Sequence, residues 1–196
     1  MNSELRFGGR VVARKLAAPG PGWLYRVRNF PNVWSGTWRH ALARALKMNH
    51  MLGRLRAVLV RADGSRVNYG VISTNLVTTA FVNDMVDELI TETSGWGDYK
   101  YHDSGVGTTG AAVGDTDIET TDGESREAGT QVEDAANIYE SVATISYTTT
   151  KAITEHLIAN ESTGGTAMDH HVFSAINVVN GDSIQFTFDL TCTAGG

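Results

Sequence analysis

The sequence predicts a mainly β protein with some helix: an antiparallel, jelly-roll-like β-sandwich preceded by an extended basic arm, one or two helices and a hairpin. From about residue 99 onward, short segments rich in β-branched and aromatic residues recur between glycine-containing turns. In residues 184–190 apolar side chains alternate with polar ones, which is typical of a strand with one buried and one solvated face. The 21 glycines and three prolines of this 196-residue chain also favour many tight turns.

Residues 1–34 are expected to form the extended arm. Residues 10–16 have the pattern of a short strand, and the Pro-Gly-Pro-Gly run at 19–22 interrupts any helix or sheet. Aromatic side chains then cluster within twelve residues, at Trp23, Tyr25, Phe30 and Trp34. Because each ring buries much area for few rotatable bonds, this cluster suits anchoring on another surface, and packing on the protein's own body is the alternative.

The next segment predicts two helices and a hairpin. Ser35 is a suitable N-cap for a basic amphipathic helix over 36–50. An Asp-Gly turn at 62–65 joins two strand patterns, 54–61 and 66–73, into a hairpin. Asn75 is then the expected cap of a second helix over 76–90, whose apolar residues recur every four positions beside an acidic outer face.

The remaining strands are predicted at 99–103, 124–131, 137–150, 152–158, 171–178 and 183–192. The last two are joined by Asn180-Gly181-Asp182, a hairpin signal. The sequence therefore predicts a docking unit over 1–74 and a body, made of a helix and the β-sandwich, over 75–196.

Charge is divided along the chain. Residues 1–66 contain thirteen Lys and Arg against two Asp and Glu, whereas residues 67–196 contain three against twenty. Such a chain attracts an acidic partner or the acidic part of a second copy. Nucleic acid is a less favoured partner, because the cations are spread over arm, helix and hairpin and the acidic part repels a polyanion.

The single cysteine, Cys192, cannot form a disulfide within the chain, which favours assembly in a reducing compartment. No apolar run approaches the length of about 18–20 residues that a membrane span needs, so no membrane partner is expected.

Several patterns resemble known chemical sites, and each has a simpler explanation. Residues 105–110 spell G-x-G-x-x-G, but the segment after them is too short and broken for a phosphate-binding helix. Neighbouring residues of a strand point to opposite faces, so neither Glu155-His156 nor Asp169 with His170-His171 converges on one metal ion. The acids between 115 and 124 lack the spacing of a calcium loop. We therefore expect no catalytic residues, no metal, no cofactor and no enzyme activity.

Five runs of residues resemble a widespread group of virion proteins of tailed bacteriophages, in the same order and at similar spacing. These runs are 75–80 (NLVTTA), 100–109 (KYHDSGVGTT), 112–116 (AVGDT), 152–156 (AITEH) and 172–186 (VFSAINVVNGDSIQF). The chain departs from that group at Leu157, where a glycine is common, and at His170, where an arginine is common. The resemblance covers about residues 75–196.

The resemblance implies a virion structural protein that is assembled in the bacterial cytoplasm and forms a homo-oligomer within the particle. A capsid decoration or cement protein bound to the major capsid protein is the preferred role, and a tail or fibre-attachment adaptor is the alternative. A nucleic-acid-binding protein is the less favoured third interpretation. The residues expected to bind the partner are Arg10, Arg14, Lys15, Trp23, Tyr25, Arg26, Arg28, Phe30, Trp34, Trp38 and Arg39.

Overall fold

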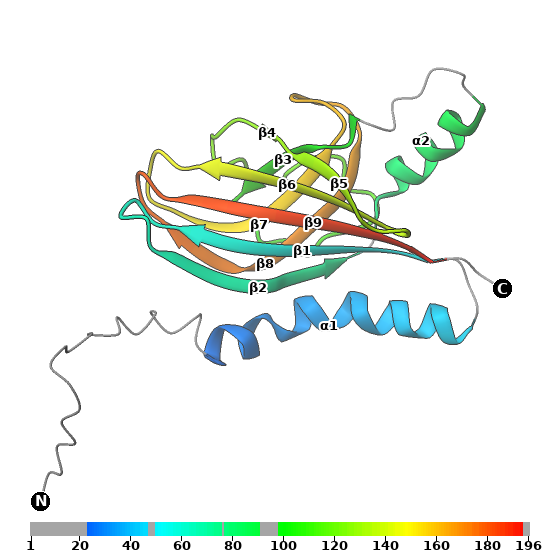
Figure 1. The fold of residues 1–196 in the computed structure, drawn as a ribbon, viewed down its shortest axis with the longest axis horizontal. Helices are drawn as coiled ribbons and strands as arrows, with labels where there is room; N and C mark the ends of the chain where they lie inside the picture. The colour runs from blue at the N-terminus through cyan, green and yellow to red at the C-terminus, as the bar shows by residue number, and fades with distance from the viewer. Residues whose placement is uncertain (1–22, 47–49, 76, 91–97, 194–196) are drawn as a thin grey trace, which may run out of the picture.

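The computed structural model describes residues 23–46, 50–75, 77–90 and 98–193. Its elements are α1 (Trp23–Ala45), β1 (His50–Val60), β2 (Arg66–Asn75), α2 (Thr79–Ile90), β3 (Tyr101–Gly105), β4 (Glu127–Ala128), β5 (Thr130–Ala135), β6 (Ile138–Ser146), β7 (Lys151–Ala159), β8 (Ala167–Val178) and β9 (Ser183–Thr193). The strands form two antiparallel sheets, ordered β2-β1-β9-β6-β5 and β4-β3-β7-β8 (Figure 1). The mainly β class with accompanying helices that the sequence predicts is confirmed.

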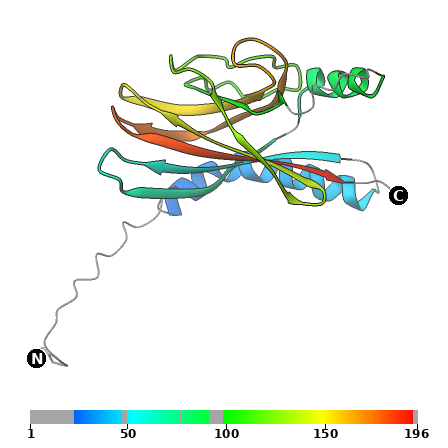
Figure 2. The same ribbon diagram turned by 45° about the horizontal axis from the view of Figure 1, so that its top comes forward.

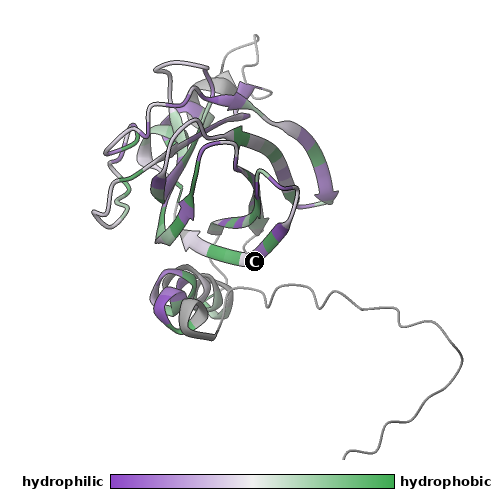
Figure 3. Ribbon diagram, turned by 90° about the vertical axis from the view of Figure 1, so that its left-hand side faces the viewer, coloured by the Kyte–Doolittle hydropathy of each residue, from purple (hydrophilic) through white to green (hydrophobic). Residues whose placement is uncertain are grey.

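The two sheets curve round a common interior, with α1 outside it (Figure 3). α1 lies beneath β2 (Figure 1). That interior is filled by side chains from both sheets, among them Leu55, Ile145, Ile158, Phe173 and Phe186, each at most 3% exposed. The two helices lie on opposite sides of this sandwich-like body (Figure 2). α1 contacts β2, β1 and β8, whereas α2 contacts β8.

The β1–β2 hairpin forms where the sequence predicts it, with Gly64 at a φ of 79° in the turn. β1 also pairs with β9 through eleven residue pairs, from His50 with Thr193 to Val60 with Ser183. The hairpin is therefore part of the five-stranded sheet. The boundary predicted between residues 74 and 75 lies at the end of β2, the second strand of the hairpin. Within the described residues before 75, α1 is the element that lies outside the sheets.

The segment predicted as one strand over 124–131 is divided into β4 and β5 by Gly129. At this residue the chain passes from the four-stranded sheet to the five-stranded sheet. A Cβ atom on Gly129 would lie 2.3 Å from Ser141 Oγ and 2.8 Å from His102 Nε2, so only glycine fits between these buried side chains. Only Gly129 separates β4 from β5, so the sequence pattern predicts a single strand although the chain changes sheets there.

The predicted extended conformation up to residue 34 is wrong for residues 23–34, which belong to α1. The helix continues through Pro31 and ends at Ala45, before the predicted end at 50. A proline inside a helix costs about 3 kcal/mol, but contacts with the body hold this segment. Asn29, which is 2% exposed, donates to the carbonyl of Ile72 in β2 and accepts the backbone N–H of Ser174 in β8.

The second helix begins at Thr79, and its cap is Thr78 rather than Asn75. Thr78 Oγ1 accepts the backbone N–H of Phe81 at 3.1 Å, the geometry of an N-cap. The Thr78 hydroxyl and backbone N–H also bond the carbonyls of Ala167 and Met168, at the start of β8. Attachment to β8 therefore keeps residues 77–78 out of the helix.

Replacing Asn29 with alanine is expected to lower the free energy of unfolding by about 2–4 kcal/mol. The change removes the bonds to Ile72 and Ser174 and leaves buried backbone groups unpaired, at about 1–3 kcal/mol each. Urea unfolding measures the loss, and Asn32→Ala, whose amide donates to Asn29 from a half-buried position, is the milder comparison. An equal loss in both variants would contradict the anchoring role of Asn29.

Candidate docking surface and buried polar clusters

An apolar stripe runs along the outer face of α1. Ten large hydrophobic side chains of the described residues are exposed, and six of them lie on α1 or directly after it. We call these six the α1 stripe: Val27, Phe30, Trp34, Trp38, Leu42 and Leu46. Exposed apolar side chains that are scattered singly need no explanation, but a contiguous row of them marks an interaction site.

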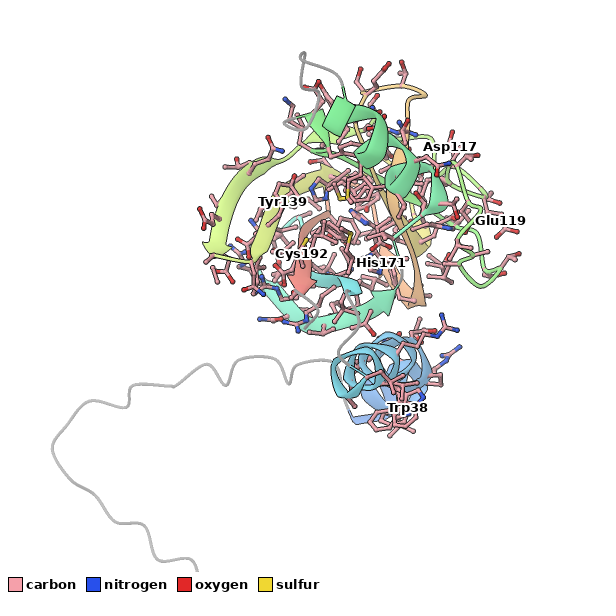
Figure 4. All side chains as sticks on the ribbon, turned by 90° about the vertical axis from the view of Figure 1, so that its right-hand side faces the viewer. Trp38, Asp117, Glu119, Tyr139, His171 and Cys192 are labelled. Carbon is pink, nitrogen blue, oxygen red and sulfur yellow. The ribbon has the colours of Figure 1, made fainter. Side chains whose placement is uncertain are left out.

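The direction of the stripe follows from the anchor on the other side of the helix. At about 100° per residue, Val27, Trp34 and Trp38 lie within about 40° of the point diametrically opposite Asn29. Trp38 accordingly points away from the sheets (Figure 4) and is 56% exposed. Phe30 stacks on Trp34, with ring centroids 5.4 Å apart and planes at 18°. The polar side of α1 therefore faces the body and the aromatic side faces outward.

The charged side chains of α1 are all basic. The helix contains no Asp or Glu, and Arg28 and Arg39 are exposed beside the stripe. A partner of this face therefore has to offer apolar surface with an acidic border.

The residues predicted to bind a partner fall into three groups. Arg28, Phe30, Trp34, Trp38 and Arg39 are all exposed on α1, with the three aromatic side chains on one flank and the outward side and the two arginines along the other flank. Trp23, Tyr25 and Arg26 lie in the first turns of the same helix. Arg10, Arg14 and Lys15 lie outside the described residues. The sequence analysis missed Val27, Leu42 and Leu46, although their helical spacing from Trp34 and Trp38 was a usable signal.

A second surface feature is a hollow at the β5–β6 hairpin, with a volume of about 470 Å³. Its lining includes Val132, Ala135, Ala136, Ile138, Tyr139 and Cys192. Glu133 contributes to the wall, and the neighbouring Asp134 is exposed. We call this the acid-rimmed hollow. It was not predicted, because the hairpin residues that line it are small or polar and show no run of large apolar side chains.

The residues 105–110, called the glycine loop here, bind carboxylates of the same chain. Glu119 Oε2 accepts the backbone N–H groups of Thr108 and Thr109, both at 2.9 Å, and Glu155 Oε1 accepts that of Gly107 at 2.7 Å. Backbone donors of this kind form phosphate sites in nucleotide-binding proteins. Here three of them are already engaged, which explains the G-x-G-x-x-G letters as a structural loop.

Glu155 is the centre of this outer cluster and has no exposed surface. Besides Gly107, its carboxylate accepts the backbone N–H groups of Thr120 and Glu119, both at 2.9 Å. Its Oε2 also lies 3.1 Å from His170 Nε2, and His170 Nδ1 lies 2.6 Å from Asp115 Oδ2. His170 thus bridges the two carboxyl groups through its two ring nitrogens and holds Asp115 of the loop against the sheet.

The remaining acids of the loop over 115–124 are also tied to the body. Arg126, whose side chain is 5% exposed, bonds Asp117 and Asp103 and the carbonyls of Glu161 and Gly164. Glu124 pairs with Lys151 at 2.7 Å. Figure 4 places Asp117 and Glu119 on the outer side of the body, far from Trp38. These acids stabilise the covering of the four-stranded sheet.

A second polar cluster lies inside the body and comprises Ser141, His102, His156, His171 and Asp169. His102 Nε2 lies 2.8 Å from Ser141 Oγ, and His102 Nδ1 lies 2.9 Å from His156 Nε2. His171 Nε2 lies 3.5 Å from Asp169 Oδ1, a distance too long for a good hydrogen bond. All five side chains have no exposed surface, so the cluster cannot reach a substrate in this state.

Burial controls the protonation of this interior cluster. Loss of water lowers the pKa of His102 and of His171 to about 3. Burial, followed by repulsion from the other histidines, lowers the pKa of His156 well below its ordinary value. Burial raises the pKa of Asp169 well above its ordinary value. The three histidines are therefore uncharged at neutral pH, and burial favours the protonated, uncharged form of Asp169, which suits a closed apolar interior.

The alternation expected for β7 and β8 holds, and it sorts the polar residues into the two clusters. Glu155 and His170 face the outer loop, whereas His156, His171 and Asp169 face the interior. Among the described residues, no group of three or more His, Cys, Asp or Glu side chains is arranged to hold a metal ion. No helix in the described ranges is long and apolar enough to cross a membrane.

A scan against protein-family models, a search of curated proteins and a search of solved structures each found no match to this chain.

Proposed function

We propose that this chain is a non-enzymatic structural protein of a tailed-bacteriophage particle that docks through the exposed face of α1. The proposal is supported chiefly by the α1 stripe, since a helix anchored by its polar side displays two tryptophans, one phenylalanine and three aliphatic side chains. Trp, with Arg at the border, is typical of the residues that contribute most binding energy at protein interfaces. The sequence resemblance to phage virion proteins is the reason for proposing that the chain belongs to a phage particle.

A capsid decoration or cement role is the preferred form of this function. The capsid surface would supply the apolar site with an acidic border that Arg28 and Arg39 require, and binding would stabilise the lattice by mass action. A tail or fibre-attachment protein is the alternative, and it uses the same face. Nucleic acid is disfavoured because Val27, Leu42 and Leu46 occupy the stripe, and aliphatic side chains neither neutralise phosphates nor provide a stacking face.

Replacing Trp38 with lysine is expected to weaken binding to particles of the encoding phage by at least tenfold, because a buried interface tryptophan is worth about 2 kcal/mol or more. Cosedimentation of the purified chain with particles that lack it measures the affinity. Val82→Lys is the matched control, since Val82 is also an exposed apolar residue on a helix, 40% accessible, but belongs to α2.

Unchanged particle binding of Trp38→Lys would overturn the docking assignment. Electron microscopy of the labelled chain on complete particles separates the capsid role from the tail role. Retention of the chain on a DNA column, falling steeply with salt, would instead favour the nucleic-acid alternative.

A further inference from the structure

We propose that a second copy of this chain binds the α1 stripe, and that Trp38 in the stripe of one copy occupies the acid-rimmed hollow of the next. This inference goes beyond the proposed function: it gives the same surface a second, competing partner, and the two are tested separately. Both surfaces, the α1 stripe and the acid-rimmed hollow, are formed by residues that the structure describes.

The stripe defines what its partner must offer. Six large apolar side chains require an apolar recess, and Arg28 and Arg39 require carboxylates at its border. Two stripes cannot satisfy each other, because α1 contains no acidic residue and the pairing would bring its arginines together. Like charges facing each other across an interface are a strong barrier to association.

The acid-rimmed hollow meets both requirements. Its volume of about 470 Å³ falls within the roughly 300–1,000 Å³ of ordinary binding clefts. Val132, which is 46% exposed, and the side chains of Ala135, Ala136 and Ile138 supply apolar surface. Glu133, which belongs to the lining, supplies a carboxylate at the border, and the next residue, Asp134, is exposed. An aromatic side chain flanked by arginine therefore finds complementary shape and charge there.

The occupant of the hollow has to come from another molecule. Asn29 bonds both β2 and β8 and fixes α1 with its stripe directed away from the body. Figure 4 shows Trp38 on the far side of α1, whereas Tyr139 and Cys192 lie at the strands. The stripe thus cannot reach the hollow of its own chain while α1 stays anchored.

The contact is heterologous, since each copy gives its stripe to one neighbour and receives a stripe from another. Such contacts generate a closed ring when the rotation between copies closes, and an open chain otherwise.

Two variants that each disable one half of the contact test this arrangement. Trp38→Lys disables the stripe and leaves the hollow intact, and Val132→Lys disables the hollow and leaves the stripe intact. Light scattering coupled to size-exclusion chromatography is expected to show oligomers of the unmodified chain and monomers of each variant alone. An equal mixture of the two is expected to form a dimer and nothing larger, because a single compatible stripe and hollow remain. Val82→Lys is expected to oligomerise like the unmodified chain.

A monomeric unmodified chain, or a mixture that stays monomeric, would overturn self-association. The docking proposal is judged separately by the particle assay: loss of particle binding in Trp38→Lys without any oligomer of the unmodified chain leaves docking in place and rejects the second copy. Oligomers abolished by Trp38→Lys, together with unchanged particle binding, would support self-association and reject docking. Near-ultraviolet circular dichroism of each variant confirms that the body is folded.

Discussion

Replacing Glu155 with glutamine is expected to lower the free energy of unfolding by about 3 kcal/mol or more and to release the glycine loop. The carboxylate accepts three backbone N–H groups, from Gly107, Glu119 and Thr120, and also contacts His170. Glutamine keeps the shape but turns one of the two acceptor oxygens into a donor, which faces other donors in a site with no exposed surface. Urea unfolding measures the loss of stability.

Amide hydrogen exchange separates loop release from general destabilisation. The N–H groups of Gly107 and Thr120 are expected to exchange at least tenfold faster in Glu155→Gln, since their acceptor is lost. Glu119→Gln is the matched control, because Glu119 also binds glycine-loop amides but lies at the surface, where water replaces lost bonds. A smaller loss of stability is expected there, and equal losses would contradict the central role of Glu155.

Stability is expected to fall steeply as the pH drops below about 6.5, because the unfolded chain gains protons that the folded chain cannot accept. Histidine has a pKa of about 6.5 in an unfolded chain. Folded His102 and His171 have a pKa of about 3, and that of His156 is also strongly lowered. Their contribution to stability is therefore complete above pH 6.5 and is lost progressively down to about pH 3.

Asp169 acts in the opposite direction. Burial raises its pKa, so the folded chain keeps a proton that the unfolded chain releases above about pH 3.9. Asp169 therefore offsets part of the effect of the three histidines, whose opposite shift is shared by three groups, so stability is still expected to fall as the pH drops. Surface carboxylates such as Glu124, whose pKa is lowered first by its bond to Lys151, add to the loss mainly at lower pH.

Urea unfolding between pH 7 and pH 4 measures this slope. His171→Leu is expected to reduce it by about 1.4 kcal/mol per pH unit, the effect of one proton. The change suits the site, because neither ring nitrogen of His171 has a hydrogen-bond partner among the described residues and its ring packs edge-on against Phe188. A flat profile in the unmodified chain would contradict the neutral, closed interior.

Sequence patterns predicted the strands well because strand alternation is a local signal. Alternation between Glu155 and His156 also predicted correctly that these neighbours serve different faces. The same reasoning could not bring His102 beside His156, since that contact depends on the pairing of β3 with β7, where His102 lies opposite Ile158. The Glu155 anchor was hidden for the same reason, because Gly107 and Thr120 approach it from a distant loop.

The first helix shows where local signals fail. Pro31 and the preceding Pro-Gly run favoured an extended arm, yet hydrogen bonds from Asn29 to β2 and β8 hold residues 23–34 in a helix. Only tertiary contacts determine this outcome. Phe30, Trp34 and Trp38 are nevertheless exposed, and their role in binding a partner stays a prediction.

The pairing of β1 with β9 sets the order of events during synthesis. These strands join residues 50–60 to residues 183–193, so the five-stranded sheet cannot close until residues 183–193 have left the ribosome. The anchor of α1 needs Ser174 of β8 as well as Ile72 of β2. The aromatic helix segment is therefore synthesised, and exposed to chaperones, long before β8 is available to fix its orientation.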